Sequence, residues 1–265
     1  MKEPDDPLGD KQRQSRRFAV SANRGRARHQ VRYVESGGGN PDSDCRVCAP
    51  MITPGGPETG TTPTDSEPMW DTRYKTEQYL YGTAPNDFLA GQYHCLPENG
   101  RVLCLADGEG RNSVFLAGLG FDVTAVDQSA VGLEKADRLA REQDVSITLV
   151  QADLADWPLG SQQWDAIVAI FCHLPPTIRS HVHSQIPAAL KPGGVLLLEA
   201  YTPAQLSLGT GGPPDVDLMQ SADILEAELS SLNFRHLLET ERDVFEGSGH
   251  TGRGAVVQVI AQCSP

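Results

Sequence analysis

The stretch RVLCLADGEGRNSVFLAGLGFDVTAVD, residues 101–127, most constrains the fold of this chain. A short apolar run over 101–106 ends in a turn that holds Gly108 and Gly110, and a second apolar run ends at Asp127. Residues 112–119 between them have the apolar spacing of a helix, which Gly120 stops. Strand, glycine turn, helix and strand in this order predict a parallel pair with a right-handed crossover, whose ligand binds beyond the carboxyl ends of the strands.

The same rhythm continues to the end of the chain and predicts one α/β domain over residues 69–265. We expect further strands at 146–153, 164–173 and 195–201, and helices at 130–143, 177–190 and 222–232. Two last β segments, at 234–245 and 254–262, flank EGSGHTGR and predict an antiparallel hairpin. Residues 1–68 hold 8 Pro and 8 Gly but only 7 Leu, Ile, Val or Phe, a composition typical of a disordered extension.

Within this extension, residues 11–32 carry eight basic side chains and no acid. The pattern fits an organelle-targeting segment, a nucleic-acid patch, a solvated tail, or a start codon placed too far upstream, since Met69 begins the ordered pattern. Cys45 and Cys48 form a C-x-x-C without a second pair, so we expect no metal site there.

The distribution of charge also separates residues 1–68 from residues 69–265. The first 68 residues hold 10 basic and 10 acidic side chains, so the net charge of -13 sits on residues 69–265. Such a surface repels phosphate backbones and anionic lipids, and no apolar run is long enough to span a bilayer. We therefore expect a small-molecule partner, no nucleic acid and no membrane, in a chain compatible with a monomer. The scattered cysteines fit a reducing compartment, and we expect a cytoplasmic protein.

The glycine turn contains two acids, Asp107 and Glu109. A phosphate beside either carboxylate would cost about 4 kcal/mol at ~4 Å and an effective dielectric of ~20, which disfavours a dinucleotide. Asp127, 19 residues after Gly108, is placed to hold the two hydroxyls of a ribose. S-adenosylmethionine combines an adenosine with a sulfonium cation and no phosphate, and Asp153 at the third strand end could meet its adenine amino group. We predict this cofactor.

Six motifs in order carry a family resemblance: WDTRY…YLYGTAPNDFL, LCLADGEGRN, AVDQS, IFCHLPP, LKPGGVLLLE and EGSGHTGRGAVVQ. Residues 69–265 resemble class I S-adenosylmethionine-dependent methyltransferases of the branch related to tellurite-resistance and thiopurine-type enzymes. The resemblance implies a Rossmann-like, seven-stranded, mostly parallel sheet of order 3-2-1-4-5-7-6 with helices on both faces. It also implies a thiol or chalcogen oxyanion as methyl acceptor. The chain departs from the family's first motif at two positions: Cys104 stands where the family has an acidic residue, and Ala106 stands where it has the first glycine. We expect Asp107 to take the place of the missing acidic residue.

By the same resemblance, the cofactor-binding residues are Trp70, Arg73, Asp107, Gly108, Gly110, Arg111, Asn112, Asp127, Gln128, Ala152, Asp153, Leu154 and Phe171. Tyr81 lies with Trp70 in the segment that folds over the cofactor in such enzymes. The alternative for Trp70 and Tyr81 is ordinary capping of the core.

Methyl transfer needs an aligned nucleophile and, for an oxygen or amine, a base. His173, after the fourth strand, is our candidate catalytic base, and the alternative is a histidine hydrogen-bonded at a strand end. We expect His181 and His183 at the surface, and Arg179 either solvated or facing an anionic substrate. The loop residues that we expect to line the acceptor pocket are Tyr201, Gly211, Gly212 and His250.

Two other functions use the same fold. One is an oxygen or nitrogen methyltransferase of a metabolite or protein, and the other is a ligand-binding module without catalysis. A nucleic-acid methyltransferase is disfavoured by the acidic domain and by FCHLPP, which lacks an N-P-P-Y type signature.

Overall fold

The computed structural model describes residues 68–265. The expectations for a disordered extension, for the basic stretch and for the Cys45 and Cys48 pair therefore lie outside the described residues.

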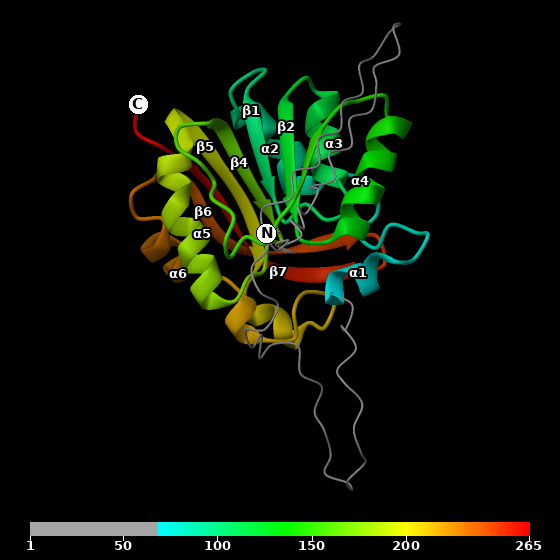
Figure 1. The fold of residues 1–265 in the computed structure, drawn as a ribbon. Helices are drawn as coiled ribbons and strands as arrows, with labels where there is room; N and C mark the ends of the chain where they lie inside the picture. The colour runs from blue at the N-terminus through cyan, green and yellow to red at the C-terminus, as the bar shows by residue number, and fades with distance from the viewer. Residues whose placement is uncertain (1–67) are drawn as a thin grey trace, which may run out of the picture.

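A single seven-stranded sheet organises these residues, in the order β3-β2-β1-β4-β5-β7-β6 (Figure 1). Its strands are β1 (Arg101–Leu105), β2 (Asp122–Asp127), β3 (Thr148–Gln151), β4 (Trp164–Ile170), β5 (Leu190–Tyr201), β6 (Asn233–Glu246) and β7 (His250–Gln262). The first five strands are parallel, while β7 runs antiparallel to both β5 and β6. The expected strand order and the terminal hairpin are confirmed.

Helices cover both faces of this sheet, as expected (Figure 1). The α-helices are α1 (Met69–Tyr74), α2 (Asp87–Gln92), α3 (Arg111–Gly118), α4 (Ala130–Glu142), α5 (Pro176–Ala189) and α6 (Ala222–Glu228). Short 3-10 turns are η2 (Tyr93–Cys95), η3 (Pro203–Ser207) and η4 (Val216–Leu218). Buried side chains of α2, α3 and α4 form the core with one face, and those of α5 and α6 form it with the other.

Some element boundaries differ from the sequence-based expectation. Strand β5 begins at Leu190, before the KPGG turn, because Leu190 pairs with Trp164 ahead of a bulge. Helix α6 ends at Glu228 instead of continuing to residue 232, and the Leu232 N–H closes a turn on the Leu229 carbonyl at 2.9 Å. A turn of this kind lets the chain enter β6 at once.

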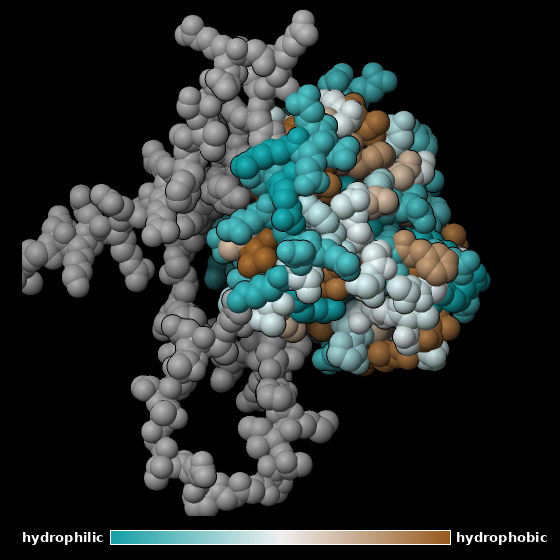
Figure 2. All heavy atoms as spheres, turned by 90° about the vertical axis from the view of Figure 1, so that its right-hand side faces the viewer, coloured by the Kyte–Doolittle hydropathy of each residue, from teal (hydrophilic) through white to brown (hydrophobic). Residues whose placement is uncertain are grey.

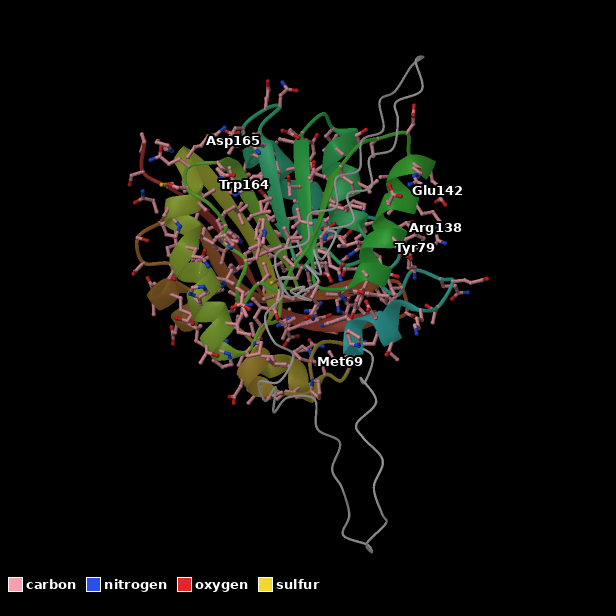
Figure 3. The ribbon with its side chains drawn as sticks, in the orientation of Figure 1. Met69, Tyr79, Arg138, Glu142, Trp164 and Asp165 are labelled. Atoms are coloured by element: carbon pink, nitrogen blue, oxygen red, sulfur yellow. The ribbon has the colours of Figure 1, made fainter. Side chains whose placement is uncertain are left out.

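The five parallel strands, β1 to β5, direct their carboxyl ends to one edge of the domain. Trp164 and Asp165, at the start of β4, lie at the edge opposite Met69 of α1 (Figure 3). The face on the α4 side mixes hydrophilic residues with separate hydrophobic spots (Figure 2). None of the helices in residues 68–265 has the length and apolar character needed to cross a membrane.

Candidate active site

The glycine turn after β1 lies at this edge and is closely packed. Ala106, Gly108 and Gly110 have φ of 49°, 58° and 87°, the left-handed region that favours glycine. A Cβ on Gly108 would lie 2.6 Å from the Tyr74 hydroxyl, and one on Gly110 would lie 2.5 Å from the Ala136 Cβ. The two glycines therefore allow α1 and α4 to approach the turn, while Ala106 accepts the same backbone conformation with a side chain.

Asp127, the last residue of β2, is fixed by two backbone donors. The Gly108 N–H bonds to Oδ2 and the Ser129 N–H bonds to Oδ1, each at 2.8 Å. Burial raises the pKa of the Asp127 carboxyl to about 6, against the lowering effect of these hydrogen bonds. Each oxygen keeps a free lone pair, so the carboxylate can accept two neighbouring hydroxyls.

Asp107 lies in the same turn and accepts a hydrogen bond from the Ser113 hydroxyl at 2.5 Å. Burial, together with the charge of the nearby Asp127, raises the pKa of its carboxyl to about 7, against the lowering effect of the hydrogen bond from Ser113. Two carboxyls with raised pKa values favour a positively charged ligand, which would stabilise their ionised forms.

Glu109 has a different role from the one that its place in the acidic turn suggests. Its carboxylate forms an ion pair with Lys135 of α4, and it accepts the Leu80 N–H at 2.7 Å. The Lys135 ammonium also donates to the carbonyls of Tyr74, Thr76 and Gln78. Glu109 therefore anchors residues 74–81 to the domain, and the expectation that its charge faces the ligand is wrong.

Helix α1 lies over the glycine turn and α4. Trp70 stacks on Tyr74 at a ring distance of 5.4 Å, and the Arg73 guanidinium lies 4.8 Å from the Trp70 ring. Asp71 accepts a hydrogen bond from the Ser129 hydroxyl at 2.5 Å, next to Asp127. Sequence analysis missed Tyr74 and Asp71, although the spacing of Trp70 and Tyr74 on one helix face was a usable signal.

The loop after β3 adjoins Asp127. The Ala152 N–H bonds to the Asp127 carbonyl at 3.0 Å, and Ala152 and Leu154 are buried. Asp153 is exposed and accepts the Ala155 N–H at 2.8 Å, and Gln128 is also exposed. The structure thus gathers these four predicted cofactor residues around the end of β2.

Arg111 and Asn112, at the start of α3, face other parts of the protein. Arg111 Nη2 donates to Glu246 Oε2 at 2.7 Å, and Asn112 Oδ1 accepts the Asn86 N–H at 3.0 Å. Arg111 is 7% exposed, and its Nη1 is buried without a hydrogen-bond partner in the described residues. Arg111 keeps one donor for a ligand, whereas the Asn112 oxygen is already occupied.

These contacts belong to a buried polar network between the leading segment and the β6–β7 hairpin. The fully buried Glu199 accepts two hydrogen bonds from Arg242, at 2.9 and 2.6 Å, and one from the Asn86 amide at 2.7 Å. The Asn86 amide also donates to Glu246 Oε1 at 2.9 Å. The network holds residues 80–86, β5 and the hairpin in one arrangement.

An aromatic cluster lies at the ends of β4 and β5. Phe171, with φ of 51°, stacks on Tyr201 at 4.5 Å and meets the edge of the His250 ring at 4.6 Å. Tyr81 also packs against His250, at a ring distance of 4.6 Å. Gly211 and Gly212 close against the Tyr201 side chain, where a Cβ would come within 3.2 and 2.8 Å of it. The expected acceptor-side residues are therefore neighbours.

His173 lies beside this cluster, but both of its ring nitrogens are bonded to backbone. Nδ1 donates to the Leu218 carbonyl at 3.0 Å, and Nε2 accepts the Tyr201 N–H at 3.4 Å. Burial lowers the pKa of His173 to about 4. A base needs a free lone pair, so this geometry contradicts the expected catalytic role and favours a histidine that holds the ends of β4 and β5.

Two further expectations, for α5, are wrong. Arg179 and His183 are 6% and 5% exposed, and both bond to Glu228 of α6. They join the two helices on the sheet face away from α4. In residues 68–265 no group of three or more His, Cys, Asp or Glu side chains is placed to hold a metal ion.

The comparisons agree with this architecture. Residues 102–194 match the family model described as "Methyltransferase domain". The Bacillus subtilis protein named "Putative methyltransferase YqeM" is 32% identical over 112 residues, which cover 40% of this chain and 44% of that relative. The chain thus matches less than half the length of this relative.

Solved structures share the fold at low identity. A "SAM-dependent methyltransferase" of Methanosarcina mazei has a TM-score of 0.52 and 18% identity, covering 65% of this chain and 96% of the other. TehB of Haemophilus influenzae has a TM-score of 0.54 and 18% identity, covering 67% of this chain and 62% of the other. A structure described as "Conversion of a Disulfide Bond into a Thioacetal Group during Echinomycin Biosynthesis" has a TM-score of 0.60 and 19% identity, covering 74% and 90%.

Proposed function

We propose that this chain is a methyltransferase that binds S-adenosylmethionine at the ends of β1, β2 and β3 and methylates a small molecule. The match of residues 102–194 to the methyltransferase family model supports methyl transfer. The fold shared with a SAM-dependent methyltransferase supports S-adenosylmethionine as the cofactor. The observation that carries the proposal is Asp127, a buried carboxylate aimed by two backbone donors with a second acid, Asp107, in the adjoining turn.

The residues present fit this cofactor group by group. The free lone pairs of Asp127 suit the ribose hydroxyls. Arg111 Nη1 is a buried donor without a partner in the described residues, and it would suit the carboxylate of the amino-acid part. The cofactor supplies a methyl group on a sulfonium leaving group, so the protein must align the acceptor and exclude water.

For the acceptor, we propose a thiol or a related chalcogen compound, as the resemblance to tellurite-resistance enzymes implies. TehB and the structure described by conversion of a disulfide to a thioacetal support sulfur-family chemistry. NodS, an N-methyltransferase of Bradyrhizobium japonicum, and the [4+2]-cyclase SpnF share the fold too. An oxygen or nitrogen acceptor is therefore the second candidate, and a module without methyl transfer is the third.

Calorimetry with S-adenosylmethionine and with NAD tests the cofactor. We expect the first to bind and the second not to bind, because the Asp107 carboxylate in the glycine turn would repel a pyrophosphate. Asp127→Asn should weaken binding at least ~30-fold, since hydrogen bonds to a charged group contribute about 1.5–3 kcal/mol each. Asp122→Asn, at the exposed start of the same strand, is the matched control and should bind as the wild type does. Binding of NAD alone would overturn the proposal.

A further inference from the structure

His250 and Glu246 form a carboxylate–imidazole pair across the turn of the β6–β7 hairpin. His250 Nδ1 donates to Glu246 Oε2 at 2.9 Å, and both side chains are only 5% exposed. Although burial opposes ionisation, the hydrogen bond from His250 and the charge of Arg111 lower the pKa of Glu246 to about 2. Glu246 is therefore an anion that fixes the histidine tautomer with its proton on Nδ1.

The opposite nitrogen of this ring is available. His250 Nε2 has no hydrogen-bond partner in residues 68–265, in contrast to His173, whose two nitrogens bond to backbone. The His250 ring lies among Tyr81, Phe171 and Tyr201, at ring distances of 4.6, 4.6 and 5.2 Å. A neutral imidazole with a free lone pair thus faces the aromatic cluster at the end of β4.

A second polar group in this cluster is also without a partner. The Tyr201 hydroxyl is buried and makes no hydrogen bond to any described residue. A Cβ at Gly211 would lie 2.9 Å from His250 Cδ2 and 3.2 Å from this hydroxyl, so the glycine faces both rings. Buried hydroxyls rarely stay unsatisfied, which points to a ligand that completes this site.

We propose that His250 Nε2 is the general base for methyl transfer, that Glu246 orients it, and that the Tyr201 hydroxyl bonds to the acceptor. The proposal deepens the proposed function and rests on it. The proton moves from the acceptor atom to Nε2, the electron pair left on that atom forms the bond to the methyl carbon, and the pair of the broken carbon–sulfur bond stays on sulfur. The acceptor class is therefore a molecule with a removable proton, such as an alkyl thiol or a phenol, instead of an oxyanion.

The charges around His250 are suited to this task. Burial lowers its pKa, the hydrogen bond and charge of Glu246 raise it, and the arginine charges lower it. The titratable or charged groups that face His250 are Glu246 of β6, Arg111 of α3, Arg73 of α1, Tyr81 of the leading segment, His173 after β4 and Tyr201 of β5. The net pKa lies below 6.5, so the ring is neutral at pH 7 and the rate should fall only as the pH drops through the acid range.

The kinetic test uses His250→Gln, which leaves the Arg111–Glu246 pair in place, with His181→Gln on the exposed side of α5 as control. The probes are benzyl mercaptan, which is protonated at pH 7, and 4-nitrothiophenol, which is ionised. We expect His250→Gln to slow methylation of benzyl mercaptan at least ~100-fold and to abolish its acid limb, with 4-nitrothiophenol affected less than ~5-fold. Equal losses with both thiols, or a wild-type rate with benzyl mercaptan, would overturn the proposal.

A second measurement needs no acceptor. Nitrogen NMR of histidine-labelled protein should show a protonated Nδ1 and an unprotonated Nε2 for His250 at pH 7. Its pKa should be lower in the complex with S-adenosylmethionine than with S-adenosylhomocysteine, because only the former carries the positive sulfur next to the base. If neither thiol reacts, the difference in the His250 pKa between the two complexes tests the proposal, and an equal pKa in both complexes would reject His250 as the base. Failure of wild-type protein to bind either compound would instead reject the proposed function.

Discussion

Gly110→Ala measures how closely the glycine turn is fitted to α4. Gly110 has φ of 87°, and a Cβ there would lie 2.5 Å from the Cβ and 2.7 Å from the Cα of Ala136. The left-handed backbone costs a residue with a side chain about 1–2 kcal/mol, and overpacking costs about 1–3 kcal/mol more. We expect a loss of roughly 2–5 kcal/mol, a large part of the ~5–15 kcal/mol typical of a domain.

Urea unfolding followed by circular dichroism measures this loss, and calorimetry measures the binding of S-adenosylmethionine. Gly91→Ala is the matched control, because Gly91 lies in α2 and a Cβ added there would meet no heavy atom within 4 Å. Alanine there should raise stability by about 0.5–1 kcal/mol. In Gly110→Ala/Ala136→Gly the contact with the Cα of residue 136 remains, so stability should stay below wild type. A Gly110→Ala variant within ~1 kcal/mol of wild type would refute the reasoning.

Three further results are expected. Burial raises the pKa of Asp107 to about 7, and a bound cation favours the ionised form of this carboxyl. Binding of S-adenosylmethionine at pH 6 should therefore release protons, and the affinity should increase as the pH rises to 8. Calorimetry in two buffers of different ionisation enthalpy measures the proton release, and proton uptake would contradict the prediction. Lys135→Met should lower the free energy of unfolding, measured in urea, by about 3–5 kcal/mol, because it leaves Glu109 as a buried unpaired charge. The control is Arg138→Met, on the exposed side of α4 over Tyr79 (Figure 3), which should leave the free energy of unfolding unchanged. Tyr201→Phe should not lower the melting temperature, since it removes a buried hydroxyl that has no partner among the described residues; a drop of several degrees would show that the hydroxyl is satisfied in solution.

The fold followed from local patterns. Apolar runs at 101–106, 122–127 and 164–173 predicted parallel strands that the structure places at 101–105, 122–127 and 164–170, and EGSGHTGR between two β segments predicted the hairpin. Asp127 was found by its spacing from Gly108, because a strand, a turn and a crossover helix of ordinary length fix where the second strand ends.

The partners of the charged side chains could not be predicted from the sequence. Glu109 and Lys135 are 26 residues apart and Arg111 and Glu246 are 135 residues apart, and each pair depends on how distant segments pack. The exposure of Arg179 and His183 on α5 was misjudged for the same reason, since their partner Glu228 comes from another helix. The free nitrogen of His250 and the occupied nitrogens of His173 are likewise visible only in three dimensions.

The pairing of Glu199 with Arg242 also protects the long β6–β7 hairpin from misalignment. Successive strand residues point to opposite faces, so a shift of β6 by one position would bring Glu241 or Asp243 to the place of Arg242. Glu199 would then meet another carboxylate in the interior, and Arg111 would lose Glu246. Glu199 and Glu246 thus favour a single alignment of the hairpin, and the shape of the candidate active site depends on that alignment.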